Sequence, residues 1–285
     1  MARITQLLDA GPTLSFEFSA PRDEEGAERL RRTLARLSTH RPHFMSVTYG
    51  AGGTTRGPTR DWVQTIRDDF QVEAMPHLTC VAHSRDEVAD IIKSYQSDRI
   101  ENILALRGDL PHGAQSSTQA FDTAAQLVDF IRQRADWDIG VAAHPEGHPM
   151  AASVEADLAH QTAKLRQADF AITQFGYRAE YYEQFVNQLD ARGVETPVIP
   201  GIMPPTNVAG IERMSALNGT EFPTDIRDRL EAASGAAQRR EIGVEVAAHL
   251  GRELLELGAP GLHIYTMNFA RAASEVAAAL GWTAD

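Results

Sequence analysis

The chain has 285 residues, of which 43% are hydrophobic and 23% are charged, and its formal net charge is −12. This composition is that of a soluble globular protein, and the negative charge disfavours non-specific binding of nucleic acid or anionic lipid. The single cysteine, Cys80, excludes an internal disulfide. The first residues lack the apolar core of a signal peptide, and no apolar run approaches the ~18 residues of a membrane span. We therefore expect a cytoplasmic protein.

Short apolar segments rich in β-forming residues recur along the chain and are separated by segments with helical spacing. In the stretch 24–37, apolar residues recur every three or four positions, and 246–257 is similar. Strands that alternate with helices at intervals of roughly 30 residues are typical of a parallel βα repeat. The expected strands lie at 14–20, 44–50, 72–80, 101–108, 138–145, 170–175, 196–203 and 261–268.

These strands predict a closed (β/α)₈ TIM barrel, which usually needs ~250 residues. The long gap from about 204 to 260 predicts an extra helical insertion between strands 7 and 8. A doubly wound open sheet is the alternative, but it usually carries G-x-G-x-x-G after its first strand. Here the first strand ends in "SAPR", without glycine. No linker or low-complexity stretch interrupts the chain, so we expect a single domain over residues 1–285.

Polar residues gather where the expected strands end. Active sites of such barrels lie at the carboxyl ends of the strands, and buried polar groups are costly unless they are paired. A rim this rich in polar groups therefore indicates a functional site. The strand-end residues are Glu17, Thr48, Tyr49, His77, Thr79, Arg107, Gly108, Asp109, His144, Glu146, His148, Thr173, Gln174, Tyr265 and Asn268.

Several of these residues also have a purely structural interpretation. Glu17 alternates with two phenylalanines and could form a salt bridge at the rim. The "GAGG" at 50–53 could be a flexible turn, because Thr55 occupies the last glycine position of a dinucleotide motif. Arg107 and Asp109 could pair with each other across a tight turn.

The group "HPEGH" at 144–148 resembles the spacing of metal ligands. Pro145 and Pro149 place it in a loop, and we expect no metal there. Cys80 is expected to be a small core residue. The amide of Gln174 can both donate and accept hydrogen bonds, which suits recognition of a heterocycle.

Eight strings in order resemble the successive signatures of the methylenetetrahydrofolate reductase family. They are "SFEFSAPR", "SVTYGAGGTTR", "PHLTC", "ALRGD", "VAAHPEGHP", "AITQF", "PVIPGIMP" and "HIYTMN". The resemblance spans about residues 13 to 280. It implies FAD at the carboxyl ends of the barrel strands, reduction by NADH or NADPH, and conversion of methylenetetrahydrofolate to 5-methyltetrahydrofolate in one-carbon metabolism. We also expect a homo-oligomer.

The resemblance assigns roles residue by residue. It makes Glu17 the proton donor, and Asp109 a carboxylate that holds flavin and faces the pterin of the substrate. It places Gln174 against the folate and the nicotinamide, and Thr48 against both flavin and substrate. The remaining flavin contacts that it implies are Tyr49, Ala51, His77, Arg107, Gly108, His144, His148, Asp157 and Lys164, the last two near the phosphates and adenosine.

The chain departs from the usual family strings in several places, including Ser19-Ala20 in the first motif and a stretch before the sixth strand that is one residue short. Arg178 replaces an acidic residue, Phe269 stands where many members have an arginine for the folate tail, and Met214 stands near an aromatic position. Two other functions remain open: a flavin-free or deazaflavin-dependent pterin reductase on the same barrel, or a folate- or flavin-binding barrel without turnover. Flavin colour in the purified protein separates the first of these from the FAD enzyme.

Overall fold

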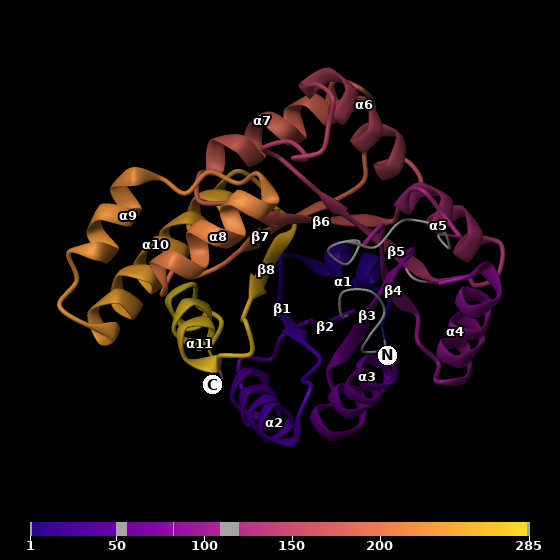
Figure 1. The fold of residues 1–285 in the computed structure, drawn as a ribbon, viewed down its shortest axis with the longest axis horizontal. Coiled ribbons are helices and arrows are strands. Elements are labelled where there is room, and N and C mark those ends of the chain that lie inside the picture. Colours follow the sequence, from indigo (N-terminus) through magenta and orange to yellow (C-terminus); the bar gives the residue numbers. More distant parts are fainter. Residues whose placement is uncertain (1, 50–55, 82, 109–119, 284–285) are drawn as a thin grey trace.

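The computed structural model describes residues 2–49, 56–81, 83–108 and 120–283. Eight parallel strands form a closed barrel in chain order, β1 to β8, as Figure 1 shows. This confirms the predicted TIM barrel. The strands are β1 (Thr13–Ser19), β2 (Phe44–Thr48), β3 (Glu73–Thr79), β4 (Asn102–Leu106), β5 (Asp138–Ala143), β6 (Phe170–Phe175), β7 (Val198–Ile202) and β8 (Gly261–Tyr265).

Most of these strands are one to three residues shorter at one or both ends than the sequence indicated. The strand β4 ends at Leu106 and β8 at Tyr265, so the polar residues that follow them lie in loops. The side chain of Asn268 ties the loop after β8 to β1, because its amide accepts from the Ser19 N–H at 2.9 Å and donates to the Ser19 carbonyl at 2.8 Å. The polar rim is therefore built mainly on loops that the strand ends hold in place.

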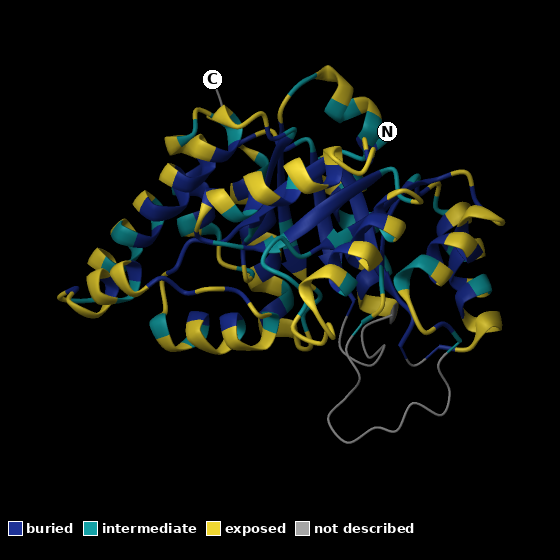
Figure 2. Ribbon diagram, turned by 90° about the horizontal axis from the view of Figure 1, so that it is seen from above, coloured by how far each residue is buried: buried dark blue, intermediate teal, exposed yellow. Residues whose placement is uncertain are grey.

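Helices surround the barrel, and their exposed residues face outward while the strands are buried (Figure 2). In α2 the Asp23 side chain accepts from the Gly26 N–H at 2.7 Å and so caps the helix. Leu30, Leu34 and Leu37 form its buried face. The helices between the strands are α2 (Glu24–Ser38), α3 (Arg56–Phe70), α4 (Arg85–Ser97), α5 (Ala124–Arg132), α6 (Val154–Leu165) and α7 (Ala179–Asp190), and α11 (Ala270–Ala279) follows β8.

A short helix that the sequence did not indicate, α1 (Ile4–Ala10), covers the amino-terminal end of the barrel. The Ile4 N–H donates to the Asn102 side chain at 2.8 Å, and the Thr5 N–H donates to Asp138 at 2.9 Å. Asn102 and Asp138 are the first residues of β4 and β5. The helix therefore closes the end of the barrel opposite the polar rim.

Three helices lie between β7 and β8, which confirms the predicted insertion. They are α8 (Val208–Asn218), α9 (Thr224–Glu231) and α10 (Ala236–Glu256). Their apolar side chains form a separate core with Phe175, Tyr177 and Met203. This packing holds α8 beside the carboxyl ends of β6 and β7. Among the helices of the described ranges, none is long and apolar enough to cross a membrane.

Candidate active site

A cavity opens at the carboxyl ends of the barrel strands. It encloses about 1090 Å³, part of which is open to solvent. Every strand or the loop after it contributes to its wall, so the closed barrel brings together residues that are far apart in the sequence. The lining residues are Glu17, Thr48, Tyr49, His77, Thr79, Val81, Leu104, Leu106, Gly108, Ala142, Ile172, Gln174, Phe175, Met203, Met214, Asn218, Tyr265 and Met267.

Eight of the strand-end residues named from the sequence line this cavity together: Glu17, Thr48, Tyr49, His77, Thr79, Gly108, Gln174 and Tyr265. Arg107 is exposed and does not line it. Ala51 and Asp109 lie outside the described residues, so their expected roles stay predictions. The backbone of Gly108 has φ +80°, and a Cβ there would approach the Thr79 Cβ to 2.8 Å. Glycine is thus required where this loop passes β3.

Glu17 points into the barrel between two histidines. Its Oε2 lies 3.5 Å from Nε2 of His77 and 3.5 Å from Nε2 of His263. The neighbouring Phe16 and Phe18 are buried in the core on the other face of β1, as the alternation predicted. Burial lowers the pKa of His77 to about 4, although the nearby Glu17 charge opposes this shift. His77 is therefore a neutral imidazole near pH 7.

His263 was missed in the sequence, although a signal for it was present. It lies two residues before Tyr265, and alternate residues of a strand share one face, so both side chains point into the barrel. Burial raises the pKa of Tyr265 well above its usual value, and the charge of Glu17 adds to this effect. The Tyr265 hydroxyl donates to the Thr173 carbonyl at 2.8 Å.

A second polar group lies on α6 and the loop after β5. The Asp157 carboxylate accepts from the His148 N–H at 3.1 Å and from the Gln161 side chain at 2.8 Å. Burial lowers the pKa of His144 to about 3, and the charge of Lys164 contributes. Burial also lowers the pKa of Lys164 to about 8. The charge of Asp157 opposes this shift, but among the described residues the Lys164 ammonium has no hydrogen-bond or ion-pair partner.

Buried polar atoms near these groups lack partners among the described residues. They include the Thr79 hydroxyl on the cavity wall and Nδ1 of His144. A buried polar group without a partner is costly, so these atoms and the unpaired Lys164 ammonium are suited to a ligand with both polar and anionic parts. FAD has this chemistry, and the residues present therefore fit it.

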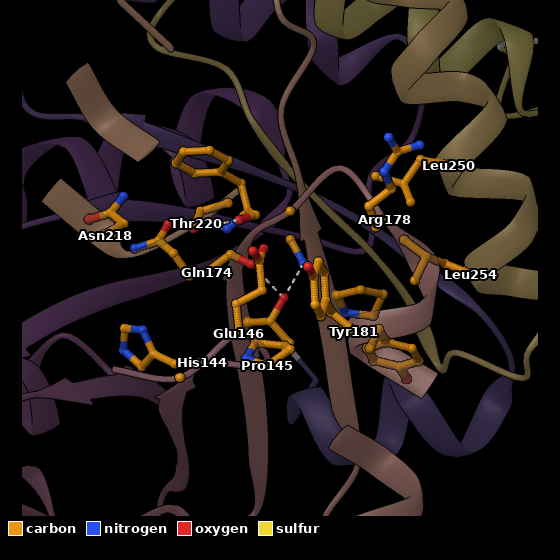
Figure 3. A pocket seen from close by; sticks show the side chains of 17 residues that line it. His144, Pro145, Glu146, Gln174, Arg178, Tyr181, Asn218, Thr220, Leu250 and Leu254 are labelled. Carbon is orange, nitrogen blue, oxygen red and sulfur yellow. Dashed lines mark hydrogen bonds between the residues drawn. The ribbon is translucent and has the colours of Figure 1, made fainter. Parts of the chain in front are cut away.

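A narrower cavity of about 420 Å³ lies beside the first and shares Gln174, Phe175 and Asn218 with it. Figure 3 shows His144, Glu146, Gln174, Arg178 and Tyr181 around it. Glu146 reaches across to accept a hydrogen bond from the Glu221 N–H at 2.6 Å. Burial raises the pKa of Glu146 to about 7.

The three members of "HPEGH" that resembled metal ligands have different partners. The rings of His144 and His148 pack edge to face with their centroids 4.8 Å apart, whereas Glu146 contacts the loop after α8. Among the described residues, no group of three or more His, Cys, Asp or Glu side chains could hold a metal ion. Arg178, which replaces an acidic residue, pairs with Asp225 at 2.6 Å.

Comparison with known proteins extends this picture. The family model described as methylenetetrahydrofolate reductase matches residues 3–281. The chain belongs to this family. It is 36% identical over 270 residues to 5,10-methylenetetrahydrofolate reductase of Salmonella typhimurium, a match that covers 94% of this chain and 90% of that one. The Escherichia coli protein of the same name is 35% identical, with the same coverage.

Other relatives of this family member are longer. Methylenetetrahydrofolate reductase (NADH) 1 of Zea mays is 34% identical over 289 residues, which are 96% of this chain and 49% of that one. Among solved structures, an uncharacterized protein from Clostridium thermocellum that binds two copies of 5-methyl-5,6,7,8-tetrahydrofolic acid aligns with a TM-score of 0.65. It is 13% identical and covers 96% of both chains. That likeness supports the barrel fold of this methylenetetrahydrofolate reductase family member.

Proposed function

We propose that this chain reduces 5,10-methylenetetrahydrofolate to 5-methyltetrahydrofolate, with FAD as bound cofactor and NADH or NADPH as the source of reducing equivalents. The observation that carries the proposal is the place of Glu17, a carboxyl group between two imidazoles inside the cavity at the barrel mouth. Family membership and the names of the relatives support the substrate. The NADH in the name of the Zea mays relative supports a nicotinamide reductant.

The residues that would hold FAD form two adjoining groups. Thr48, Tyr49, His77 and Gly108 line the cavity at the ends of β2 to β4, where the flavin ring would lie. His144, His148, Asp157 and Lys164 would hold the phosphates and adenosine. Arg107, Ala51 and Asp109 complete the proposed set. When bound, the flavin supplies the hydride.

Glu17 is proposed to act as the general acid. A C–N bond of the substrate's five-membered ring must break, the leaving nitrogen takes up a proton, and the methylene carbon receives the hydride. A carboxyl group can deliver that proton if it lies within hydrogen-bond reach of the nitrogen. Glu17 lines the cavity with a side chain that is only 17% exposed.

Gln174 is proposed to orient the pterin. Its side-chain Oε1 accepts from the Phe175 N–H at 3.1 Å, so the amide nitrogen is available to donate into the cavity. A pterin carries both donors and acceptors on its edge, which matches an amide. The same residue would contact the nicotinamide when the reductant occupies the cavity.

The proposal is tested with the purified full chain. FAD binding is measured by quenching of flavin fluorescence. The oxidised-flavin absorbance is then followed anaerobically, first on addition of NADH or NADPH and then on addition of methylenetetrahydrofolate. We expect bleaching, then recovery with formation of 5-methyltetrahydrofolate. Folded protein that binds no FAD yet forms this product would favour the flavin-free reductase, and FAD binding without either absorbance change would favour a barrel that only binds.

A further inference from the structure

His263 is a buried polar residue of the barrel interior to which the proposed function gives no role. Its side chain is fully buried in β8. The ring stacks on Phe44, with centroids 6.0 Å apart and an interplanar angle of 17°, and meets Tyr265 edge to face at 5.3 Å. Aromatic contacts on two sides leave the imidazole little freedom to rotate.

Hydrogen bonds fix the direction of both ring nitrogens. Nδ1 lies 2.8 Å from the hydroxyl oxygen of Ser15. With Nδ1 accepting from that hydroxyl, Nε2 carries the proton and can donate to Glu17. Ser15 is the register partner of His263 across β1 and β8. Nε2 lies 3.5 Å from Glu17 Oε2 and 3.5 Å from the Ser46 hydroxyl. The ring is therefore held with Nε2 toward the carboxyl group of Glu17.

The two oxygens of Glu17 have unequal surroundings. Oε2 faces both His77 and His263, at 3.5 Å each. Oε1 makes no hydrogen bond with another residue of the described ranges. The two histidines come from β3 and β8, so they approach Oε2 from different strands of the barrel. One oxygen is thus held by the protein, and the other is available to a ligand.

We propose that His263 is a positioning residue that holds Oε2 of Glu17 so that Oε1 is presented to the reacting nitrogen of the substrate. This inference rests on the function proposed above. His263 does not line the cavity, whereas His77 does, so His263 would act on the reaction through Glu17 and not by touching a ligand. The proton that Glu17 donates leaves from Oε1, and the contact between His263 and Oε2 stays in place.

Two substitutions separate the ends of the imidazole. In His263→Asn the side-chain amide ends where Nδ1 was, so the variant keeps the contact with Ser15 and loses the contact with Glu17. In His263→Gln the amide nitrogen can reach the position of Nε2. For the Asn variant we expect the saturating rate of methylenetetrahydrofolate reduction to fall on the order of 10-fold, less than the ~10²-fold or more for loss of a general acid. Flavin bleaching by NAD(P)H, FAD affinity and half-saturation by the folate should change little, and His263→Gln should recover most of the rate.

His40→Asn is the matched control. His40 is also buried and bonded to a serine, with Nε2 2.8 Å from the Ser274 hydroxyl and Nδ1 2.6 Å from the Trp282 carbonyl, but it does not line the cavity. It measures the general cost of removing a buried histidine. In a Glu17→Gln background, His263→Asn should have little further effect on the folate rate, because residues that act as one unit are not additive.

Three results would overturn the inference: a His263→Asn rate equal to that of wild type, an equal loss in both half-reactions, or a Gln variant as slow as the Asn variant. If His263→Asn does not fold, imidazole nitrogen NMR replaces it. The His263 Nε2 resonance should then shift between wild type and Glu17→Gln, and an unchanged resonance would exclude the contact. A wild-type chain that never reduces the folate would instead overturn the proposed function.

Discussion

His144 and Gln161 are joined by reciprocal hydrogen bonds. The His144 N–H donates to the Gln161 side-chain oxygen at 2.7 Å, and the Gln161 side-chain nitrogen donates to the His144 carbonyl at 2.9 Å. The loop after β5 is thereby fixed to α6. Asp157, Gln161 and Lys164 are spaced four and three residues apart on this helix, so they share one face. This arrangement brings Lys164 to the same site as His144 and His148.

Lys164→Glu should weaken FAD binding without unfolding the barrel. An ammonium group attracts phosphate, and a carboxylate in its place repels it, with little screening by water at a half-buried position. We expect the dissociation constant for FAD to rise on the order of 10-fold or more at low salt. Fluorescence quenching measures the constant, and circular dichroism checks the fold.

Lys93→Glu is the control for this charge reversal, because Lys93 is the only other lysine of the chain. Its side chain is 74% exposed on α4 and lies 3.3 Å from Asp90. Both variants change the net charge by the same amount, so a general electrostatic effect would weaken FAD binding equally in both. Equal affinities in wild type and Lys164→Glu would place Lys164 away from the phosphates.

Glu17→Gln should block the folate half-reaction and spare the nicotinamide half-reaction. Reduction of the flavin needs no proton at the folate nitrogen, so bleaching by NAD(P)H should stay near the wild-type rate. Reoxidation by methylenetetrahydrofolate should slow by ~10²-fold or more, as expected for loss of a general acid. Stopped-flow absorbance follows the two steps separately. Glutamine keeps the size of the side chain, so FAD content should be little changed.

The outcome for this variant also distinguishes other roles. If both half-reactions slow equally, Glu17 positions the flavin or supports the structure. If neither slows, the proton comes from water or from another rim residue, and Asp109 would be the first to examine.

Glu146→Gln should change how stability depends on pH. Burial raises the pKa of Glu146 from 4.5 to about 7. Between these values the folded protein binds more protons than the unfolded chain, so this group lowers stability as pH rises from about 4.5 to about 7. Glutamine removes the effect and can still accept from the Glu221 N–H. The variant should therefore melt at a higher temperature than wild type at pH values above 7, with a smaller difference near 5.

Glu183→Gln is the reference for this comparison, because Glu183 is exposed on α7. Its melting temperature should track that of wild type across the same range. A Glu146→Gln protein with an unchanged pH dependence would mean that the Glu146 carboxyl is well hydrated in solution.

The barrel could be predicted from sequence because strands covered on both faces read as nearly continuous apolar runs. Glu17 could be predicted because it interrupts such a run, and Gln174 because it stands near the end of another. The position of His263 beside Glu17 could not be predicted from the sequence. It depends on the register of β1 with β8, and these strands are separated by almost the whole length of the chain.

Local sequence patterns also did not predict the helix α1 or the hydrogen-bond partner of Glu146. The helix α1 has only seven residues, and its first N–H groups bond to Asn102 and Asp138, far along the chain. Glu146 stood between two histidines in the sequence, yet its partner is a backbone N–H of the α8–α9 loop. In both cases long-range contacts determine the local structure, and no short window of sequence contains them.

Gly201→Ala should destabilise the barrel beside the cavity. A Cβ at Gly201 would overlap the Thr173 carbonyl oxygen and approach Tyr265 Cε2 to 2.5 Å. Tyr265 would have to move, which would break its hydrogen bond to Thr173. Overpacking of this kind costs ~1–3 kcal/mol, and chemical denaturation should show a loss of stability of that size.

Gly57→Ala is the control, because Gly57 lies in α3 and a Cβ there meets nothing within 4 Å. Alanine is also the better helix former, so that variant should be as stable as wild type or slightly more stable. Equal stability of the two variants would mean that β7 can shift away from Tyr265 at no cost, and the wall of the cavity would then be less rigid than its packing indicates.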